Sequence, residues 1–138
     1  MAPETELKGN AMTASPDLQR QMLRRMQTIR RFEERASDDY HSGDIYGVVH
    51  CYIGEEAVAV GVCSALRGED QIISNHRGHG HCVAKGAELK QMFCELLGKE
   101  EGYCRGKGGS MHIADQSNGN LGANAIVGGS MGIATGSA

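Results

Sequence analysis

The sequence predicts an α/β protein in which N-terminal helices precede the start of a mostly parallel sheet. Three observations predict this class: a long amphipathic helix opens the chain, a short apolar strand spans residues 71–74, and further helical patterns follow that strand. The order helix, strand, helix is typical of α/β units. At 138 residues, the chain is long enough to bury one hydrophobic core.

The first predicted element is a helix that begins at Ser15-Pro16-Asp17 and ends near Gly43. A capping hydroxyl, a proline in the first turn and an acid near the positive end of the helix dipole are typical of helix starts. Apolar residues then recur at steps of three and four and predict one buried stripe: Leu18, Met22, Met26, Ile29, Phe32, Ala36 and Tyr40. The arginine pairs at 24–25 and 30–31 are interpreted as its solvated face. Residues 1–14 are expected to form a flexible tail.

A second helix is predicted over residues 54–66, after a loop that begins at residue 44. This helix is rich in alanine and valine and is apolar nearly all round, so we expect it to be buried on most sides. Its first turn carries Glu55 and Glu56. Either carboxylate could act as a general base, but acids in a first turn are more often explained by the helix dipole.

The remaining elements are shorter. The strand at residues 71–74 is followed by predicted helices over 80–84 and 88–97. A second strand is expected near residues 125–128, where a short apolar run lies between glycines. The last residues, 132–138, have the composition of the first turns of a small-residue helix, so we expect the chain to be the N-terminal part of a longer protein.

Composition excludes several classes of function. The formal net charge of −3 leaves no basic face for nucleic acid, and no apolar stretch is long enough to cross a membrane. The five cysteines never approach the spacing of a zinc or redox site, and their odd number fits free thiols in a reducing compartment. The acidic leader does not have the pattern of a signal or transit peptide. We therefore expect a cytoplasmic protein.

The segment 73–81, ISNHRGHGH, is the most informative part of the chain. Arg77 offers a planar fork of donors that suits phosphate oxygens, and the flanking glycines let backbone N–H groups approach a ligand closely. The pattern predicts a loop that binds a phosphorylated cofactor. His76, His79 and His81 could also gather around a metal ion, but no further ligand is identifiable, so we assign no metal ligand. A metal-dependent hydrolase and purely structural histidines stay open as alternatives.

Two other segments of the chain suggest a functional role. Residues 102–108, GYCRGKG, are similar to a phosphate-binding P-loop, but three residues separate the glycines instead of four, and Gly108 stands where a serine or threonine would hold magnesium. We reject that interpretation. His50 lies in a mostly apolar run beside the start of the second helix. It could be a hydrogen-bonded structural residue or a catalyst, and the pattern alone does not decide between them.

Five segments together resemble the α subunit of the E1 component of 2-oxo acid dehydrogenase complexes, of the pyruvate and acetoin dehydrogenase type. They are RRMQTIRRFEERA, HCYIGEEAVAVGV, ISNHRGHGH, GKGGSMHIAD and GANAIVGGSMGIATG, in the family's order. The resemblance covers roughly residues 18–138. It implies a thiamin diphosphate-binding α/β fold with a central, mostly parallel sheet, of which we expect residues 15–138 to form the N-terminal part.

The resemblance also implies roles for individual residues. Arg77 would contact the cofactor pyrophosphate, with His76 at a position where the family often has tyrosine. The backbone at Ala125 and Val127 would face the aminopyrimidine ring, although Ala125 stands where glycine is common. His50 would line the substrate end as the catalytic candidate. The implied reaction is oxidative decarboxylation of pyruvate, or cleavage of acetoin, with acyl transfer to lipoamide.

The resemblance implies partners as well: an E1 β subunit in a heterotetramer, a lipoyl-bearing E2 acyltransferase, and a small 2-oxo acid or acetoin. Magnesium would accompany the diphosphate, but the family's Gly-Asp-Gly motif followed by asparagine does not occur here, so its ligands are expected beyond residue 138. We expect the 138-residue chain alone to bind the cofactor weakly and to turn over nothing. The alternative is a non-catalytic remnant that only pairs with a β subunit.

Overall fold

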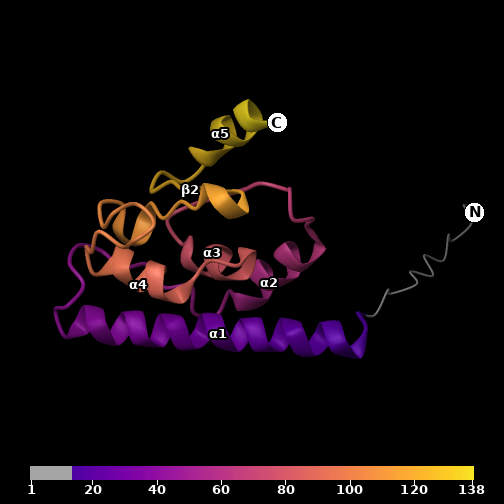
Figure 1. Cartoon of the computed structure of the whole chain (residues 1–138), viewed down its shortest axis with the longest axis horizontal. Helices are drawn as coiled ribbons and strands as arrows, with labels where there is room; N and C mark the ends of the chain where they lie inside the picture. Colours follow the sequence, from indigo (N-terminus) through magenta and orange to yellow (C-terminus); the bar gives the residue numbers. More distant parts are fainter. Residues whose placement is uncertain (1–13) are drawn as a thin grey trace, which may run out of the picture.

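The computed structural model describes residues 14–138, and the predicted N-terminal tail lies outside them except for its last residue. Along the chain the elements are α1 (Pro16–His41), α2 (Glu56–Ala65), β1 (Ile72–Ser74), α3 (His79–Lys85), α4 (Leu89–Leu96), the 3-10 turns η1 (Gly109–Met111) and η2 (Gln116–Asn118), β2 (Asn120–Ala123) and α5 (Ser130–Ser137). In Figure 1, α1 lies along one side, α2, α3 and α4 lie next to it, and α5 lies on the opposite side. This helix-rich arrangement with a small parallel sheet confirms the predicted α/β class.

Helix α1 begins where the sequence predicts. The side chain of Ser15 accepts a hydrogen bond from the backbone N–H of Leu18 at 3.3 Å, and Pro16 occupies the first turn. The helix ends at His41, two residues before the predicted stop at Gly43. The middle of the predicted apolar stripe is buried, while Tyr40 at its end is exposed. The local signals therefore predicted this element correctly.

Two polar contacts of α1 were not expected. Arg30, predicted to lie on a solvated face, forms an ion pair with Glu56 at 2.6 Å and so ties α1 to the start of α2. The same carboxylate accepts the N–H of Gly54. Both contacts give Glu56 a structural role at the start of α2, in place of the role of a general base. Glu33 of α1 is fully buried. A buried carboxylate requires partners, and the Nδ1 of His79 lies 3.1 Å from both oxygens of Glu33.

The core lies between α1, α2, α3 and α4, and η1 packs against α4. Its largest fully buried apolar side chains are Ile29, Tyr52, Val60, Met92 and Ile113. Gly80 of α3 packs directly on the ring of Tyr52, because a β-carbon at that position would lie 2.2 Å from Cδ1 of the ring. Helices α3 and α4 match their predicted positions within a residue or two.

The predicted burial of the second helix is wrong. Only Glu56, Ala59 and Val60 of α2 are buried, whereas Val58 and Val62 are 60% and 56% exposed. The reason is that α2 packs mainly on α1 and α3, through the face that carries Ala59 and Val60. None of the helices in residues 14–138 combines the length and the apolar character that a bilayer crossing requires.

The predicted position of the second strand is also wrong. Strand β2 spans Asn120–Ala123 and pairs in parallel with β1, with Ile72 opposite Asn120 and Ser74 opposite Ala123. Residues 125–128 instead form a turn, in which the side chain of Asn124 accepts the N–H of Ile126 at 2.9 Å. The apolar side chains of this turn, Ile126 and Val127, are 71% and 73% exposed. Apolar composition alone therefore misplaced the strand.

Candidate functional site

The candidate site lies at the carboxyl ends of the two strands. Because β1 and β2 are parallel, the loops that follow them leave the same edge of the sheet, which is where α/β folds place their ligands. The backbone N–H of Asn124 donates to the carbonyl of Ser74 at 3.0 Å and joins the two loops. One loop carries His76 and Arg77, and the other carries Ala125 and Val127. Four of the five predicted site residues therefore belong to adjacent loops.

Arg77 is anchored at both its backbone and its side chain. Its N–H donates to the side chain of Asn75 at 2.9 Å, which closes a tight turn directly after β1. Its guanidinium Nη1 donates to the backbone carbonyl of Cys51 at 2.5 Å. The following Gly78 lies so close to the other loop that a β-carbon would approach the side chain of Ala123 to 2.9 Å. Arg77 therefore faces the segment that carries His50 and is partly buried against it.

His50 and His76 are neighbours. Their ring centroids lie 4.9 Å apart and the ring planes are nearly perpendicular, at 83°. Burial lowers the pKa of His50 below its ordinary value, and the positive charge of Arg77 and the nearby His76 and His79 act in the same direction. The imidazole of His50 is therefore mainly neutral at neutral pH, with a free ring nitrogen lone pair. His50, His76 and Arg77 thus form one local group at the edge of the sheet.

One atom of this group has no partner within the described residues. The Nδ1 nitrogen of His76 is buried and has no hydrogen bond from residues 14–138. Buried polar atoms are nearly always hydrogen-bonded in native proteins, which makes His76 Nδ1 an unusual atom of this loop.

His79 is fully buried in the core. Its Nδ1 lies 3.1 Å from both carboxylate oxygens of Glu33, and its Nε2 lies 3.0 Å from Oγ of Ser110. His79 and Glu33 are fully buried, and Ser110 is nearly so. The sequence pattern did not predict this set, because its members come from α1, α3 and η1. The one local signal was an acid, Glu33, directly beside Phe32 in the apolar stripe.

His81 has a third, separate set of partners. Its Nδ1 is hydrogen-bonded to Oγ of Ser74 at 2.5 Å, and its Nε2 to the hydroxyl of Tyr52 at 2.9 Å. Burial raises the pKa of Tyr52 to about 12 and lowers the pKa of His81, so both groups are neutral at neutral pH. The three histidines of the motif thus diverge. Across residues 14–138, no three His, Cys, Asp or Glu side chains are placed to hold a metal ion.

The segment His50–Tyr52 is held at three consecutive residues. The N–H of His50 donates to Oγ of Ser110 at 3.2 Å, the carbonyl of Cys51 accepts from Arg77, and the hydroxyl of Tyr52 meets His81. This segment has no regular secondary structure of its own. Its conformation is therefore fixed by side chains that lie far away in the sequence.

The glycine-rich loop at residues 102–109 binds an internal anion. Glu95 of α4 is fully buried, and its carboxylate accepts four backbone N–H groups at 2.7–3.0 Å, from Cys104, Gly106, Gly108 and Gly109. At Gly102, a β-carbon would approach the backbone of Glu95 to 2.6 Å. The amides that could have contacted a phosphate are thus occupied by a carboxylate, in agreement with the rejection of a P-loop.

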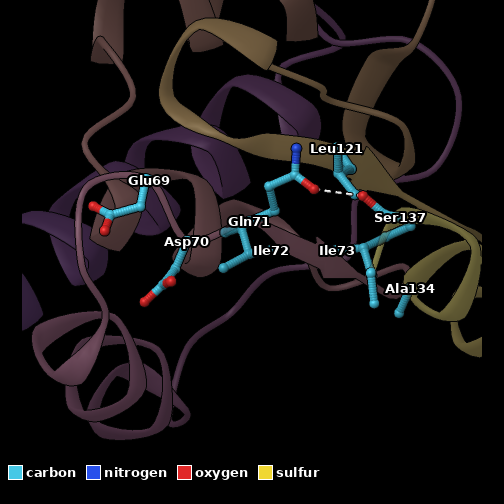
Figure 2. Close-up of a pocket in the computed structure, with 9 residues that line it drawn as sticks. Glu69, Asp70, Gln71, Ile72, Ile73, Leu121, Ala134 and Ser137 are labelled. Carbon is cyan, nitrogen blue, oxygen red and sulfur yellow. Dashed lines mark hydrogen bonds between the residues drawn. The ribbon is translucent and has the colours of Figure 1, made fainter.

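A cleft of about 330 Å³ lies elsewhere, between the sheet and α5 (Figure 2). Figure 2 shows Gln71, at the amino end of β1, hydrogen-bonded to Ser137 of α5 across this cleft. Its charged lining residues are Glu69 and Asp70, which would repel an anion. It also opens near the start of β1 and not near its carboxyl end. We therefore do not assign the phosphate-binding loop to this cleft.

A family model and several curated relatives match most of this chain. The family model described as dehydrogenase E1 component matches residues 24–138. Two similar relatives are acetoin:2,6-dichlorophenolindophenol oxidoreductase α subunits, from Bacillus subtilis (51% identical over 96% of the chain) and Cupriavidus necator (56% over 78%). The α subunit of the pyruvate dehydrogenase E1 component of Zymomonas mobilis is 48% identical over 78% of the chain. The chain spans 40%, 32% and 31% of the length of these three relatives, respectively.

Proposed function

The chain belongs to the dehydrogenase E1 component family, and on this premise we propose that it is the α-side part of a thiamin diphosphate-dependent E1 enzyme. In this proposal the enzyme cleaves acetoin or pyruvate and transfers the acyl group to lipoamide. The single observation that carries it is the convergence of His50, His76 and Arg77 at the carboxyl edge of the sheet. That edge is where a parallel α/β fold binds its ligand.

The residues present fit a diphosphate. A guanidinium has five N–H donors, and the Cys51 carbonyl uses one of those of Arg77, so donors are left for phosphate oxygens. The unpartnered Nδ1 of His76 supplies a further contact, and Gly78 keeps the turn free of a side chain. Residues Arg77 and His76 would hold the diphosphate, and the backbone at Ala125 and Val127 would face the aminopyrimidine.

The chemistry divides between cofactor and protein. When bound, thiamin diphosphate supplies the chemistry that breaks a carbon–carbon bond next to a carbonyl. The chain supplies binding and orientation through Arg77 and His76. His50, whose neutral form is favoured by its surroundings, would line the substrate end and exchange a proton there.

Acetoin is the first substrate to test. The two relatives named for acetoin are 51% and 56% identical to the chain, whereas the Zymomonas mobilis relative, named for pyruvate dehydrogenase, is 48% identical. The name of these two relatives also includes 2,6-dichlorophenolindophenol, a dye whose reduction provides a simple assay. We propose acetoin ahead of pyruvate on this basis.

The wider assembly follows from the family. We propose a β-type E1 subunit in a heterotetramer, a lipoyl-bearing E2 acyltransferase, and Mg²⁺ as the counter-ion of the diphosphate. The five cysteines in residues 14–138 are free thiols, which supports a cytoplasmic location.

A second candidate function is pairing without catalysis. Two segments expose large apolar side chains. Helix α2 exposes Val58 and Val62, and the turn before α5 and α5 itself expose Ile126, Val127, Met131 and Ile133. Exposed apolar groups of this kind favour a protein interface. In this alternative, the chain would bind a β-type subunit and contribute no turnover.

One experiment separates the two functions. The chain is coexpressed with the β-type subunit of an acetoin dehydrogenase complex, the complex is isolated by size exclusion, and reduction of dichlorophenolindophenol is followed with acetoin or pyruvate. Thiamin diphosphate-dependent reduction is expected, faster with acetoin. A stable complex without cofactor-dependent reduction would favour pairing alone. Samples without the β-type subunit and without the cofactor are the controls.

A further inference from the structure

A continuous chain of buried hydrogen bonds runs from α1 to the backbone of His50. Glu33 contacts His79 at 3.1 Å, His79 contacts Ser110 at 3.0 Å, and Ser110 contacts the N–H of His50 at 3.2 Å. Glu33 and His79 are 0% exposed and Ser110 is 7% exposed. The contacts join residues that are 46, 31 and 60 positions apart in the sequence. We call Glu33, His79 and Ser110 the buried relay.

One arrangement of protons satisfies every group of the buried relay when Glu33 is ionised and His79 is neutral. The Glu33 carboxylate then accepts, and the Nδ1 of His79 carries the proton and donates to it. The Nε2 of His79 then accepts from the hydroxyl of Ser110, whose oxygen keeps lone pairs for the N–H of His50. Charge on Glu33 thereby sets the tautomer of His79, and the tautomer sets the direction of the Ser110 hydroxyl.

The same three residue types make the acid–histidine–serine triad of hydrolases, and the distances here would suit one. A nucleophilic serine needs a substrate beside it. A cleft of about 300 Å³ reaches Ser110 from the side of Tyr46, but the serine is nearly buried and its oxygen already accepts from His50. The geometry therefore favours a structural connection to His50 over nucleophilic attack.

We propose that Glu33, His79 and Ser110 are positioning residues that hold the backbone of His50 and thereby orient its ring beside His76. This inference rests on the proposed function, in which His50 lines the substrate end. His50 lies outside any helix or strand, so no regular backbone pattern fixes its position. The Ser110 hydroxyl is the acceptor for its N–H, and the buried relay orients that hydroxyl.

The test uses the full chain and Ser110→Ala, which removes the acceptor of the His50 N–H. Loss of one net hydrogen bond should make the His50 amide exchange its hydrogen about tenfold faster. Ser110→Thr keeps a hydroxyl and should restore slow exchange. Ser64→Ala is the matched control, because Ser64 lies on α2, outside the buried relay. In the assembled enzyme, Ser110→Ala should lower turnover about tenfold with an unchanged cofactor requirement.

A second measurement needs no variant. The ¹⁵N shifts of His79 in the unmodified chain should show a proton on Nδ1 and a bare Nε2. A proton on Nε2, or unchanged His50 exchange in Ser110→Ala, would overturn the positioning role. Labelling of Ser110 by a fluorophosphonate probe would overturn it in favour of a nucleophilic serine.

Failure of the proposed function would give a result different from failure of the positioning role. If His50→Ala leaves turnover intact, His50 has no role in the reaction, and the proposed function loses its catalytic residue. The exchange rate of the His50 amide and the tautomer of His79 still report on the buried relay in that case. The two proposals therefore fail independently.

Discussion

The guanidinium of Arg77 donates a hydrogen bond to the backbone carbonyl of Cys51, at 2.5 Å between Nη1 and the oxygen. These residues are 26 positions apart, and their contact joins the loop after β1 to the segment that carries His50. One side chain therefore faces the proposed diphosphate site and at the same time fixes the neighbouring segment. Substitution of Arg77 should therefore affect both the binding of the diphosphate and the position of the segment that carries His50.

Arg77→Ala should weaken cofactor binding. A hydrogen bond to a charged group contributes about 1.5–3 kcal/mol, so the half-saturating concentration of thiamin diphosphate should rise on the order of 10- to 100-fold. Titration of activity in the assembled enzyme measures this. Arg24→Ala, on the exposed face of α1, is the matched control and should change nothing. An unaltered cofactor requirement in Arg77→Ala would refute the assigned role.

Stability should fall as the pH drops below about 6.5, partly because of His81. Burial holds the pKa of His81 in the folded chain below the ordinary 6.5. In that range the unfolded chain takes up a proton that the folded chain does not bind, so the free energy of unfolding decreases until the pH passes the folded pKa. Above pH 6.5 both states are neutral and His81 adds no pH dependence. One proton limits the slope to about 1.36 kcal/mol per pH unit.

His81→Gln should flatten that slope, because glutamine does not titrate. Urea unfolding between about pH 5 and pH 8 measures it. His41→Gln, at the exposed end of α1, is the control for the loss of a histidine outside the core. Equal slopes in His81→Gln and the unmodified chain would show that burial of His81 does not control this pH range.

Gly80→Ala should destabilise the fold. The added β-carbon would lie 2.2 Å from Cδ1 of Tyr52, and that ring is fully buried and cannot move into solvent. Overpacking of this kind costs about 1–3 kcal/mol. Gly61→Ala, also within a helix, meets no atom within 4 Å and should be neutral or stabilising by about 0.5–1 kcal/mol. Thermal unfolding of both variants provides the comparison, and equal stability would contradict the close contact.

Glu95→Gln should destabilise the loop at residues 102–109. The carboxylate accepts four backbone N–H groups, and a side-chain amide would turn two donors toward them. Each buried donor that is left unsatisfied costs about 1–3 kcal/mol, so we expect a loss of about 3 kcal/mol or more. The amides of Gly106 and Gly108 should exchange faster. Glu101→Gln, at an exposed position, is the control, and equal unfolding free energies would count against this account of the loop.

Local signals predicted the elements that depend on local interactions. Helix α1 begins at its predicted cap because Ser15 and Pro16 act within the first turn. Strand β2 was misplaced because a strand exists only through its partner, and the pairing with β1 selects Asn120–Ala123 over the more apolar residues 125–128. The exposure of Val58 and Val62 on α2 likewise depends on which helices cover it.

The sequence by itself determined the α/β class, the start of the first helix and the family, and it predicts a loop suited to phosphate around Arg77. Only the tertiary structure decided what each histidine does: His76 lies against His50, His79 binds Glu33 and Ser110, and His81 binds Ser74 and Tyr52. The physical reason is that a hydrogen bond requires two groups within about 3 Å. Most of these partners are tens of residues apart, so they meet only when the helices pack around a common core.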